Sequence, residues 1–148
     1  MSLTGDKMDK EKVLETLNQL LERELAGLVR YTHYSFMVFG HTRIPIIGWL
    51  RGLARESLTH AELIGEHITA LGGHPSLKIA SLLETHKHSI NDILQESIEH
   101  EREQVELFKK LLGQVQGHSV FLEEFARQLT ADEETHISEV EKMLRQPK

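Results

Sequence analysis

Residues that interrupt helices are rare in this chain and gather in three short stretches. Proline occurs only at Pro45, Pro75 and Pro147, and the breaker-rich stretches are residues 40–45, 72–75 and 113–117. Between them apolar residues recur every three or four positions, which is the period of an α-helix with one buried face. The pattern predicts an all-α chain with helices over residues 10–39, 44–71, 89–112 and 119–145.

The connections predict how these helices are arranged. Short turns join the first helix to the second and the third to the fourth, so each pair should form an antiparallel hairpin. Residues 72–88 make a longer connection, and about 17 extended residues can span roughly 55 Å, the length of such a bundle. Because this segment also carries apolar residues, it is expected to lie against the bundle; these residues are Leu77, Ile79, Leu82 and Leu83. We predict a single domain, residues 1–148, folded as an all-α four-helix bundle of two antiparallel hairpins joined by a long crossover.

Composition excludes several functions. The absence of cysteine rules out disulfides, thiolate metal sites and a cysteine nucleophile. A net charge of −6 argues against nucleic acid as a partner. The most apolar stretches are short and interrupted by charges, so no membrane partner is expected, and we predict a cytoplasmic protein.

Acidic residues interrupt the apolar face of every predicted helix near its middle, and two of the helices also place a histidine there. These residues are Glu24, Glu56, His60, Glu101, Glu133 and His136. Glu24 precedes His60 by about 36 positions and Glu101 precedes His136 by about 35. Counted from the turns, the four acids fall at nearly one height, which predicts a single shared site built by both halves of the chain.

Four buried carboxylates need a compensating charge. Each costs several kcal/mol to bury, and together they would exceed the stability of about 5–15 kcal/mol of a whole domain. The predicted core faces contain no lysine or arginine, so divalent metal ions are expected instead. Carboxylate together with imidazole suits iron, manganese or zinc. Glu133 and His136 also match the Glu-x-x-His element of di-metal bundles.

Over residues 12–145 the chain resembles the ferritin-like superfamily, and bacterioferritin most closely. The resemblance rests on LLERELAGLVRY at 20–31, HAE at 60–62, LGGHP at 71–75, Glu101, and DEETH at 132–136. It implies a centre for two iron ions, with manganese or zinc as alternatives. It further implies that the protein oxidises Fe(II) to Fe(III) with O2 or H2O2, in iron storage or detoxification, and that it forms a homo-oligomer.

The resemblance also implies a role for each site residue. Glu24 and Glu101 would be terminal ligands, and Glu133 would bridge the two metal ions. His60 and His136 would each bind one of the ions through the imidazole. Tyr31 is expected beside the site, hydrogen-bonded to a ligand. Glu24, Glu101, Glu133 and Tyr31 would then take part in the oxidation.

Three departures from the family pattern qualify these expectations. The family places a glutamate where this chain has Ser57, with Glu56 one position earlier. Glu56 and His60 share a helix face, so Glu56 could still reach the site, especially over a π-bulge. Otherwise one bridging carboxylate is lost and the second metal binds weakly or not at all.

Leu58 replaces the haem-ligating methionine of bacterioferritin, so no haem is expected. The sequence ends about twelve residues after His136, so a full bacterioferritin-type cage is not expected.

Two other functions stay open from the sequence. The first is a bundle that holds a single structural or stored metal, such as zinc, without turnover. The second is a helical interaction module without metal, whose acids pair with arginine or water. Among the remaining histidines, His33 and His67 are interpreted as structural, and no role is given to His74, His86, His88 and His118.

Overall fold

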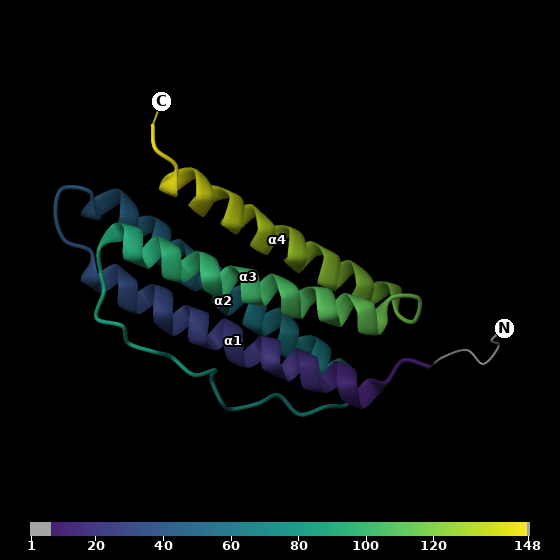
Figure 1. The fold of residues 1–148 in the computed structure, drawn as a ribbon. Helices are drawn as coiled ribbons and strands as arrows, with labels where there is room; N and C mark the ends of the chain where they lie inside the picture. Colours follow the sequence, from purple (N-terminus) through teal and green to yellow (C-terminus); the bar gives the residue numbers. More distant parts are fainter. Residues whose placement is uncertain (1–6, 148) are drawn as a thin grey trace.

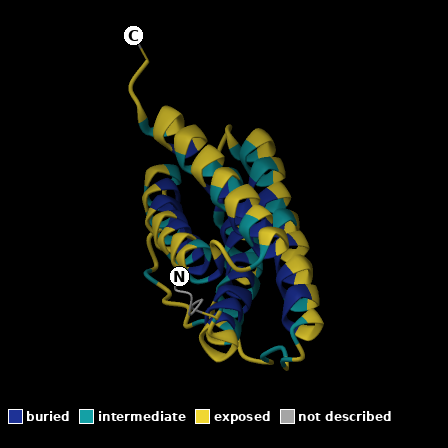
Figure 2. Ribbon diagram, turned by 90° about the vertical axis from the view of Figure 1, so that its right-hand side faces the viewer, coloured by how far each residue is buried: buried dark blue, intermediate teal, exposed yellow. Residues whose placement is uncertain are grey.

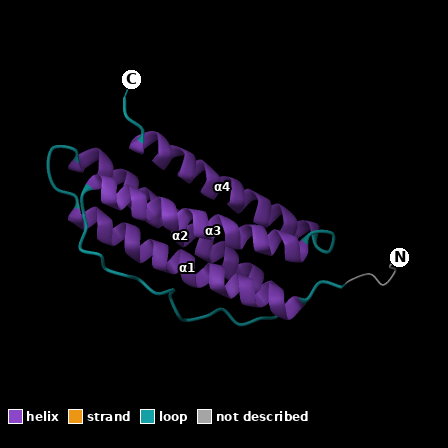
Figure 3. Cartoon of the chain, viewed as in Figure 1, coloured by secondary structure: helices purple, strands orange, loops and turns teal. Residues whose placement is uncertain are grey.

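The computed structural model describes residues 7–147 and contains four helices (Figure 1). They are α1 (Lys10–Met37), α2 (Arg43–Ala70), α3 (Ile90–Val115) and α4 (Val120–Leu144). Within the described range there is no β-strand (Figure 3). The predicted all-α class is confirmed.

The helices pack as two antiparallel hairpins, α1 with α2 and α3 with α4, and α1 also packs against α3. The crossover, residues 72–88, starts near the beginning of α1 and follows the bundle to its other end, where α3 begins (Figure 1). Because of this return path, α2 and α3 run in the same direction. The predicted arrangement of two hairpins joined by a long crossover is confirmed.

Polar caps and glycines set the helix ends. α1, α3 and α4 each follow a residue whose side chain accepts a hydrogen bond from a backbone N–H three positions later: Asp9, Ser89 and Ser119. The turns contain glycines with φ values of 100°, 81° and 81°, at Gly40, Gly72 and Gly117. This left-handed backbone favours glycine, which has no Cβ.

α3 runs past its predicted end at residue 112 as far as Val115. The sequence placed a break at Gly113, because an interior glycine costs a helix about 1 kcal/mol. Leu111 and Val115 on either side of it are fully buried in the core, and burying one such side chain is worth about 1.5–3 kcal/mol. Packing therefore outweighs the local preference of the glycine.

Two apolar layers divide the core along the bundle. One layer contains Leu17 and Phe108 near the start of α1, and the other contains Leu50 near the opposite end, with Ile98 in a third cluster beside it. Buried residues line the facing sides of the helices, and the crossover lies largely exposed outside them (Figure 2). The polar residues predicted to form the site lie between the apolar layers.

The crossover contacts the bundle through polar groups rather than through its apolar side chains. The backbone N–H of Ala80 donates to the Glu22 carbonyl at 2.9 Å, and Asn18 bonds the backbone of Ser76 at 2.8 Å and of His74 at 3.2 Å. The apolar side chains of this segment are exposed, at Leu77, Ile79, Leu82 and Leu83. The crossover therefore lies against the bundle as expected, but its backbone and polar groups make the contacts and its leucines stay exposed.

Candidate metal centre

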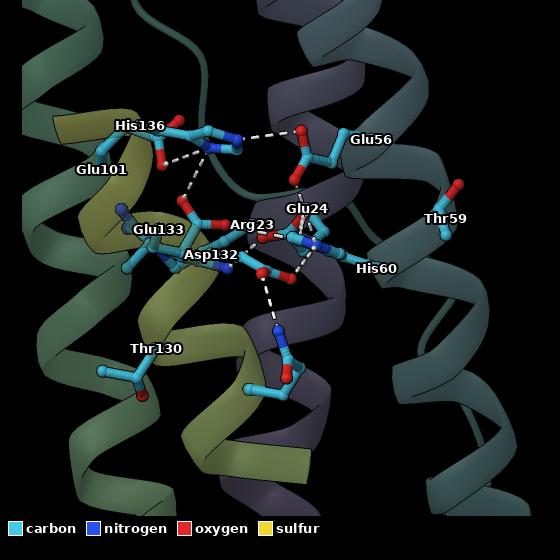
Figure 4. A network of polar contacts seen from close by, with 12 residues as sticks. Arg23, Glu24, Glu56, Thr59, His60, Glu101, Thr130, Asp132, Glu133 and His136 are labelled. Atoms are coloured by element: carbon cyan, nitrogen blue, oxygen red, sulfur yellow. Dashed lines mark hydrogen bonds and ion pairs between the residues drawn. The ribbon is translucent and has the colours of Figure 1, made fainter. Parts of the chain in front are cut away.

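All four helices direct acidic or imidazole side chains into one polar layer at mid-height (Figure 4). α1 contributes Glu24, α2 contributes Glu56 and His60, α3 contributes Glu101, and α4 contributes Glu133 and His136. Glu24, His60, Glu101 and Glu133 are each at most 6% exposed. The structure thus brings together all six residues that the core-face pattern singled out.

One group in this layer consists of Glu24, His60 and Glu133. The Nδ1 atom of His60 lies 3.4 Å from Oε2 of Glu24 and 3.4 Å from Oε1 of Glu133. Oε2 of Glu24 and Nδ1 of His60 are both buried and have no hydrogen-bond partner. Buried polar atoms without partners are unfavourable, and a cation held between them would satisfy both.

A second group consists of Glu101, Glu133 and His136. The Nδ1 atom of His136 lies 3.9 Å from Oε2 of Glu101 and 3.8 Å from Oε2 of Glu133, and this nitrogen is likewise buried without a hydrogen-bond partner. Glu133 therefore belongs to both groups, with Oε1 directed to one and Oε2 to the other. This is the placement that a bridging carboxylate needs.

Glu56 lies on the opposite side of both imidazoles from the buried carboxylates. Its carboxylate is 2.8 Å from Nε2 of His136 and 3.7 Å from Nε2 of His60, and 37% of its side chain is exposed. α2 is a regular α-helix throughout, so no π-bulge moves Glu56 inward. Ser57 is the buried residue, and a Cβ added at Gly27 of α1 would lie 3.0 Å from its hydroxyl.

Tyr31 and Asp132 complete the surroundings of the two groups. The buried hydroxyl of Tyr31 donates a hydrogen bond to the Glu101 carboxylate, beside the second group. Asp132 was not singled out as a site residue by the sequence, yet its carboxylate lies 3.4 Å from Nε2 of His60. Being next to Glu133 in the sequence, Asp132 gave no core-face signal of its own.

Sequence reasoning also missed a buried amide that connects the site to an arginine. Gln104 donates to Oε1 of Glu24 at 2.8 Å and accepts from Nε of Arg23 at 2.8 Å. Arg23 also contacts Glu103 at 2.9 Å. Gln104 follows Glu101 by one helical turn, so its position on the same face was the available signal.

Replacing Gln104 by alanine should destabilise the metal-free protein by about 1–3 kcal/mol, because a buried oxygen of Glu24 loses its donor and Arg23 loses its acceptor. Urea unfolding in the presence of a chelator measures the change. Gln95→Ala, at an exposed position of the same helix, should change the stability little. Equal losses in the two variants would contradict this account.

In the absence of a cation, bound protons compensate the negative charge of the acidic residues in this layer. Burial alone would lower the pKa of His60, but the carboxylates of Glu133 and Glu24 outweigh it and raise the pKa to about 10. For His136, Glu133 and Glu56 likewise outweigh burial and raise the pKa to about 10. Burial raises the pKa of Glu24 to about 7. A bound metal ion requires neutral imidazoles and ionised carboxylates, so it must displace these protons.

A cavity of about 120 Å³ surrounds the groups. Its lining includes the site residues and extends to Ala80 and Ser81 of the crossover. Since a water molecule in the liquid takes about 30 Å³, the cavity has room for more than one ion with its water.

None of the helices within residues 7–147 contains a stretch long and apolar enough to cross a bilayer.

Two helix hairpins joined by a crossover, with a carboxylate–histidine layer at mid-height, define a ferritin-like four-helix bundle. The model of the family described as ferritin-like domain matches residues 14–148, and the chain belongs to this family. The superfamily predicted from the sequence is thereby confirmed.

The proteins similar to this chain have low sequence identity to it. Bacterial non-heme ferritins of Escherichia coli and Shigella flexneri are 26% identical over 95 residues, which cover 64% of this chain and 58% of their own length. A ferritin-like diiron-carboxylate protein of Bacillus anthracis superposes with a TM-score of 0.88 at 22% identity, over 95% of this chain and 100% of that chain. The bacterioferritin of Desulfovibrio desulfuricans gives a TM-score of 0.84 at 20% identity, over 94% of this chain and 82% of that chain.

A third solved structure comes from a bacterioferritin-related protein. It is a dodecameric thioferritin of Bacteroides fragilis, with a TM-score of 0.84 at 23% identity, covering 93% of this chain and 87% of that chain. These likenesses establish the fold of the chain, whereas the chemistry must be argued from its own side chains.

Proposed function

We propose that this protein binds two iron ions in the polar layer and oxidises Fe(II) to Fe(III) with O2 or H2O2, in iron storage or detoxification. The observation that carries the proposal is Glu133, whose two carboxylate oxygens are directed to different imidazole nitrogens, 3.4 Å from His60 and 3.8 Å from His136. Glu24 and Glu101 complete the two sets as terminal ligands. Carboxylate and imidazole together fit iron, with manganese or zinc as competitors.

Iron is the substrate in this proposal. Two Fe(II) ions would each lose one electron, reducing O2 to H2O2, or H2O2 to water, with the uptake of two protons. The protein holds the ligands in a buried layer and keeps bulk water out. Tyr31 fixes the Glu101 carboxylate by donating a hydrogen bond to it. Glu56 accepts from Nε2 of His136 when that nitrogen is protonated, which leaves Nδ1 free to bind a metal.

Position 57 supports a second candidate function, a bundle that binds a single metal without turnover. Ser57 supplies no carboxylate, and Glu56 is directed at the Nε2 nitrogens, outside the two groups that share Glu133. The centre then lacks a second bridging carboxylate. Metal analysis of protein purified without added metal separates the candidates, because the first predicts about two irons per chain and the second about one zinc.

Replacing His136 or Glu101 by alanine should slow Fe(II) oxidation at least about tenfold, because each change removes a proposed ligand. The assay follows Fe(III) formation in air, or in peroxide under anaerobic conditions. His118→Ala and Glu99→Ala, at exposed positions, are the matched controls and should oxidise iron like the parent. The proposal fails if the site variants are as fast as these controls.

We further propose that the protein is a cytoplasmic homo-oligomer. The bacterioferritin-related neighbour from Bacteroides fragilis is described as dodecameric. Here Phe39 and Ile44 are about three-quarters exposed, at 74% and 75%, and Leu77 is 97% exposed. Contiguous exposed apolar surface is typical of contacts with another subunit, and sedimentation at several protein concentrations tests the assembly.

A further inference from the structure

Three side chains of metal-binding type meet outside the polar layer, where the crossover ends. His33 belongs to α1, whereas Glu84 and His88 belong to the crossover. Nε2 of His33 lies 2.7 Å from Oε2 of Glu84, and Nε2 of His88 lies 3.2 Å from Oε1 of the same carboxylate. One potential ligand atom from each residue falls within 4.8 Å of the other two.

The contact between His33 and Glu84 is close but does not have hydrogen-bond geometry. Nε2 of His33 is shielded from solvent and has no hydrogen-bond partner, although the Glu84 oxygen is 2.7 Å away. The imidazole rings of His33 and His88 stand edge to face with centroids 5.6 Å apart. A nitrogen and a carboxylate oxygen that are close but not aligned for a hydrogen bond can both face an ion placed between them.

The backbone of the crossover is shaped to present Glu84 and His88 together. His86 has a φ of 58°, a left-handed conformation that costs a non-glycine residue roughly 1–2 kcal/mol. Its N–H donates to Oε1 of Glu84 at 2.7 Å, and Thr85 donates to Glu96 of α3 at 2.8 Å. This turn places the side chains of Glu84 and His88 on the side that faces α1.

The types of ligand atom in the cluster indicate which kind of metal ion it would bind. The backbone N–H of His86, with His33 and His88 nearby, lowers the pKa of Glu84, so its carboxylate is ionised. Two imidazoles and one carboxylate match borderline transition ions such as Zn²⁺, which takes three protein ligands and a water, rather than Ca²⁺ or Mg²⁺, which prefer oxygen. All three side chains are partly exposed, so the cluster lies at the surface, although Nε2 of His33 itself is covered.

We propose that His33, Glu84 and His88 form a second metal site, for one Zn²⁺-like ion per chain, which fastens the end of the crossover to α1. Sequence analysis gave no metal-binding role to either histidine, because residues 33 and 88 become neighbours only through the path of the crossover. The site shares no residue with the central layer and does not depend on the function proposed for that layer. Binding there would restrain the crossover where it enters α3.

Equilibrium dialysis against Zn²⁺, with metal counted per chain, tests the proposal. His33→Ala and Glu84→Gln should each bind about one equivalent less than the parent. His86→Asn is the matched control, since asparagine tolerates a left-handed backbone and the His86 imidazole is not a proposed ligand. It should retain the full stoichiometry. His136→Ala, which affects only the central layer, should still show the equivalent that His33→Ala loses.

Hydrogen exchange of residues 82–89 provides the second measurement. Zn²⁺ should slow exchange there in the parent and in His136→Ala, but not in His33→Ala. Circular dichroism should show that every variant is folded, as expected for changes at partly exposed positions. The proposal is overturned if His33→Ala and Glu84→Gln bind as much Zn²⁺ as the parent, or if Zn²⁺ leaves the exchange of residues 82–89 unchanged in the parent.

Discussion

Replacing Glu133 by glutamine should reduce the rate of Fe(II) oxidation at least about 100-fold. Glutamine has nearly the same size as glutamate, so the packing around this buried position is preserved. It removes the negative charge that both groups share through Oε1 and Oε2. Because oxidation of two Fe(II) ions requires both groups, loss of the shared ligand should affect the rate more than loss of a terminal ligand.

Glu134→Gln is the control for this experiment. Glu134 is the next residue in α4, and its side chain is 56% exposed, 3.8 Å from Lys109. It should oxidise iron at the parental rate and bind the same number of ions. A Glu133→Gln protein that remains folded and oxidises iron as fast as Glu134→Gln would refute the bridging role of Glu133.

The metal-free protein should lose several kcal/mol of unfolding free energy between pH 7 and pH 10. The pKa values of His60 and His136 are raised from 6.5 to about 10. The folded state therefore binds protons more tightly than the unfolded state, and the resulting stability is complete below pH 6.5 and is lost as the pH approaches 10. Glu24, with its pKa raised to about 7, loses its contribution in the same direction between pH 4.5 and 7.

Glu133 and Glu56 do not offset this loss, because their pKa values are lowered. Both remain ionised throughout the alkaline range, so their contribution is constant there. Urea unfolding with a chelator at several pH values measures the slope. His136→Gln should flatten it, whereas His118→Gln should not. Protein saturated with metal should lose less stability, because the ion has already replaced the protons. A metal-free protein equally stable at pH 7 and pH 10 would contradict the proposed proton compensation.

The helical period predicted the fold and most of the central layer, because it depends on local sequence alone. It placed Glu24, His60, Glu101 and Glu133 on core faces, and all of these are buried. Periodicity defines a face only to within about one residue, however. It therefore left Glu56 and Ser57 as alternatives, and the structure buries Ser57 while directing Glu56 to the outer side of the imidazoles.

Features that depend on contacts between distant segments could not be predicted in this way. Gln104 lies on the correct face of α3, but its bonds to Arg23 and Glu24 depend on how α1 and α3 pack. The crossover has no helical period, so neither the exposure of Leu77 nor the meeting of His33 with His88 was visible in the sequence. At Gly113 the low helix propensity of glycine favours a helix end, whereas burial of the neighbouring side chains favours a longer helix. The burial outweighs the propensity, so α3 continues past Gly113.

The shared position of Glu133 makes the two halves of the layer unequal. Glu101, Glu133 and His136 all come from the α3–α4 hairpin, whereas the other group combines Glu133 with Glu24 and His60 of the α1–α2 hairpin. An ion in the first group would bind within one hairpin. An ion in the second group would cross-link the two hairpins. The chain between its ligands on α2 and α4 contains the entire crossover. Because these ligands meet only in the folded chain, the ion would stabilise the fold by binding to it and not to the unfolded chain. The same cation would thus act as a reversible cross-link, in a chain that has no cysteine to make a permanent one.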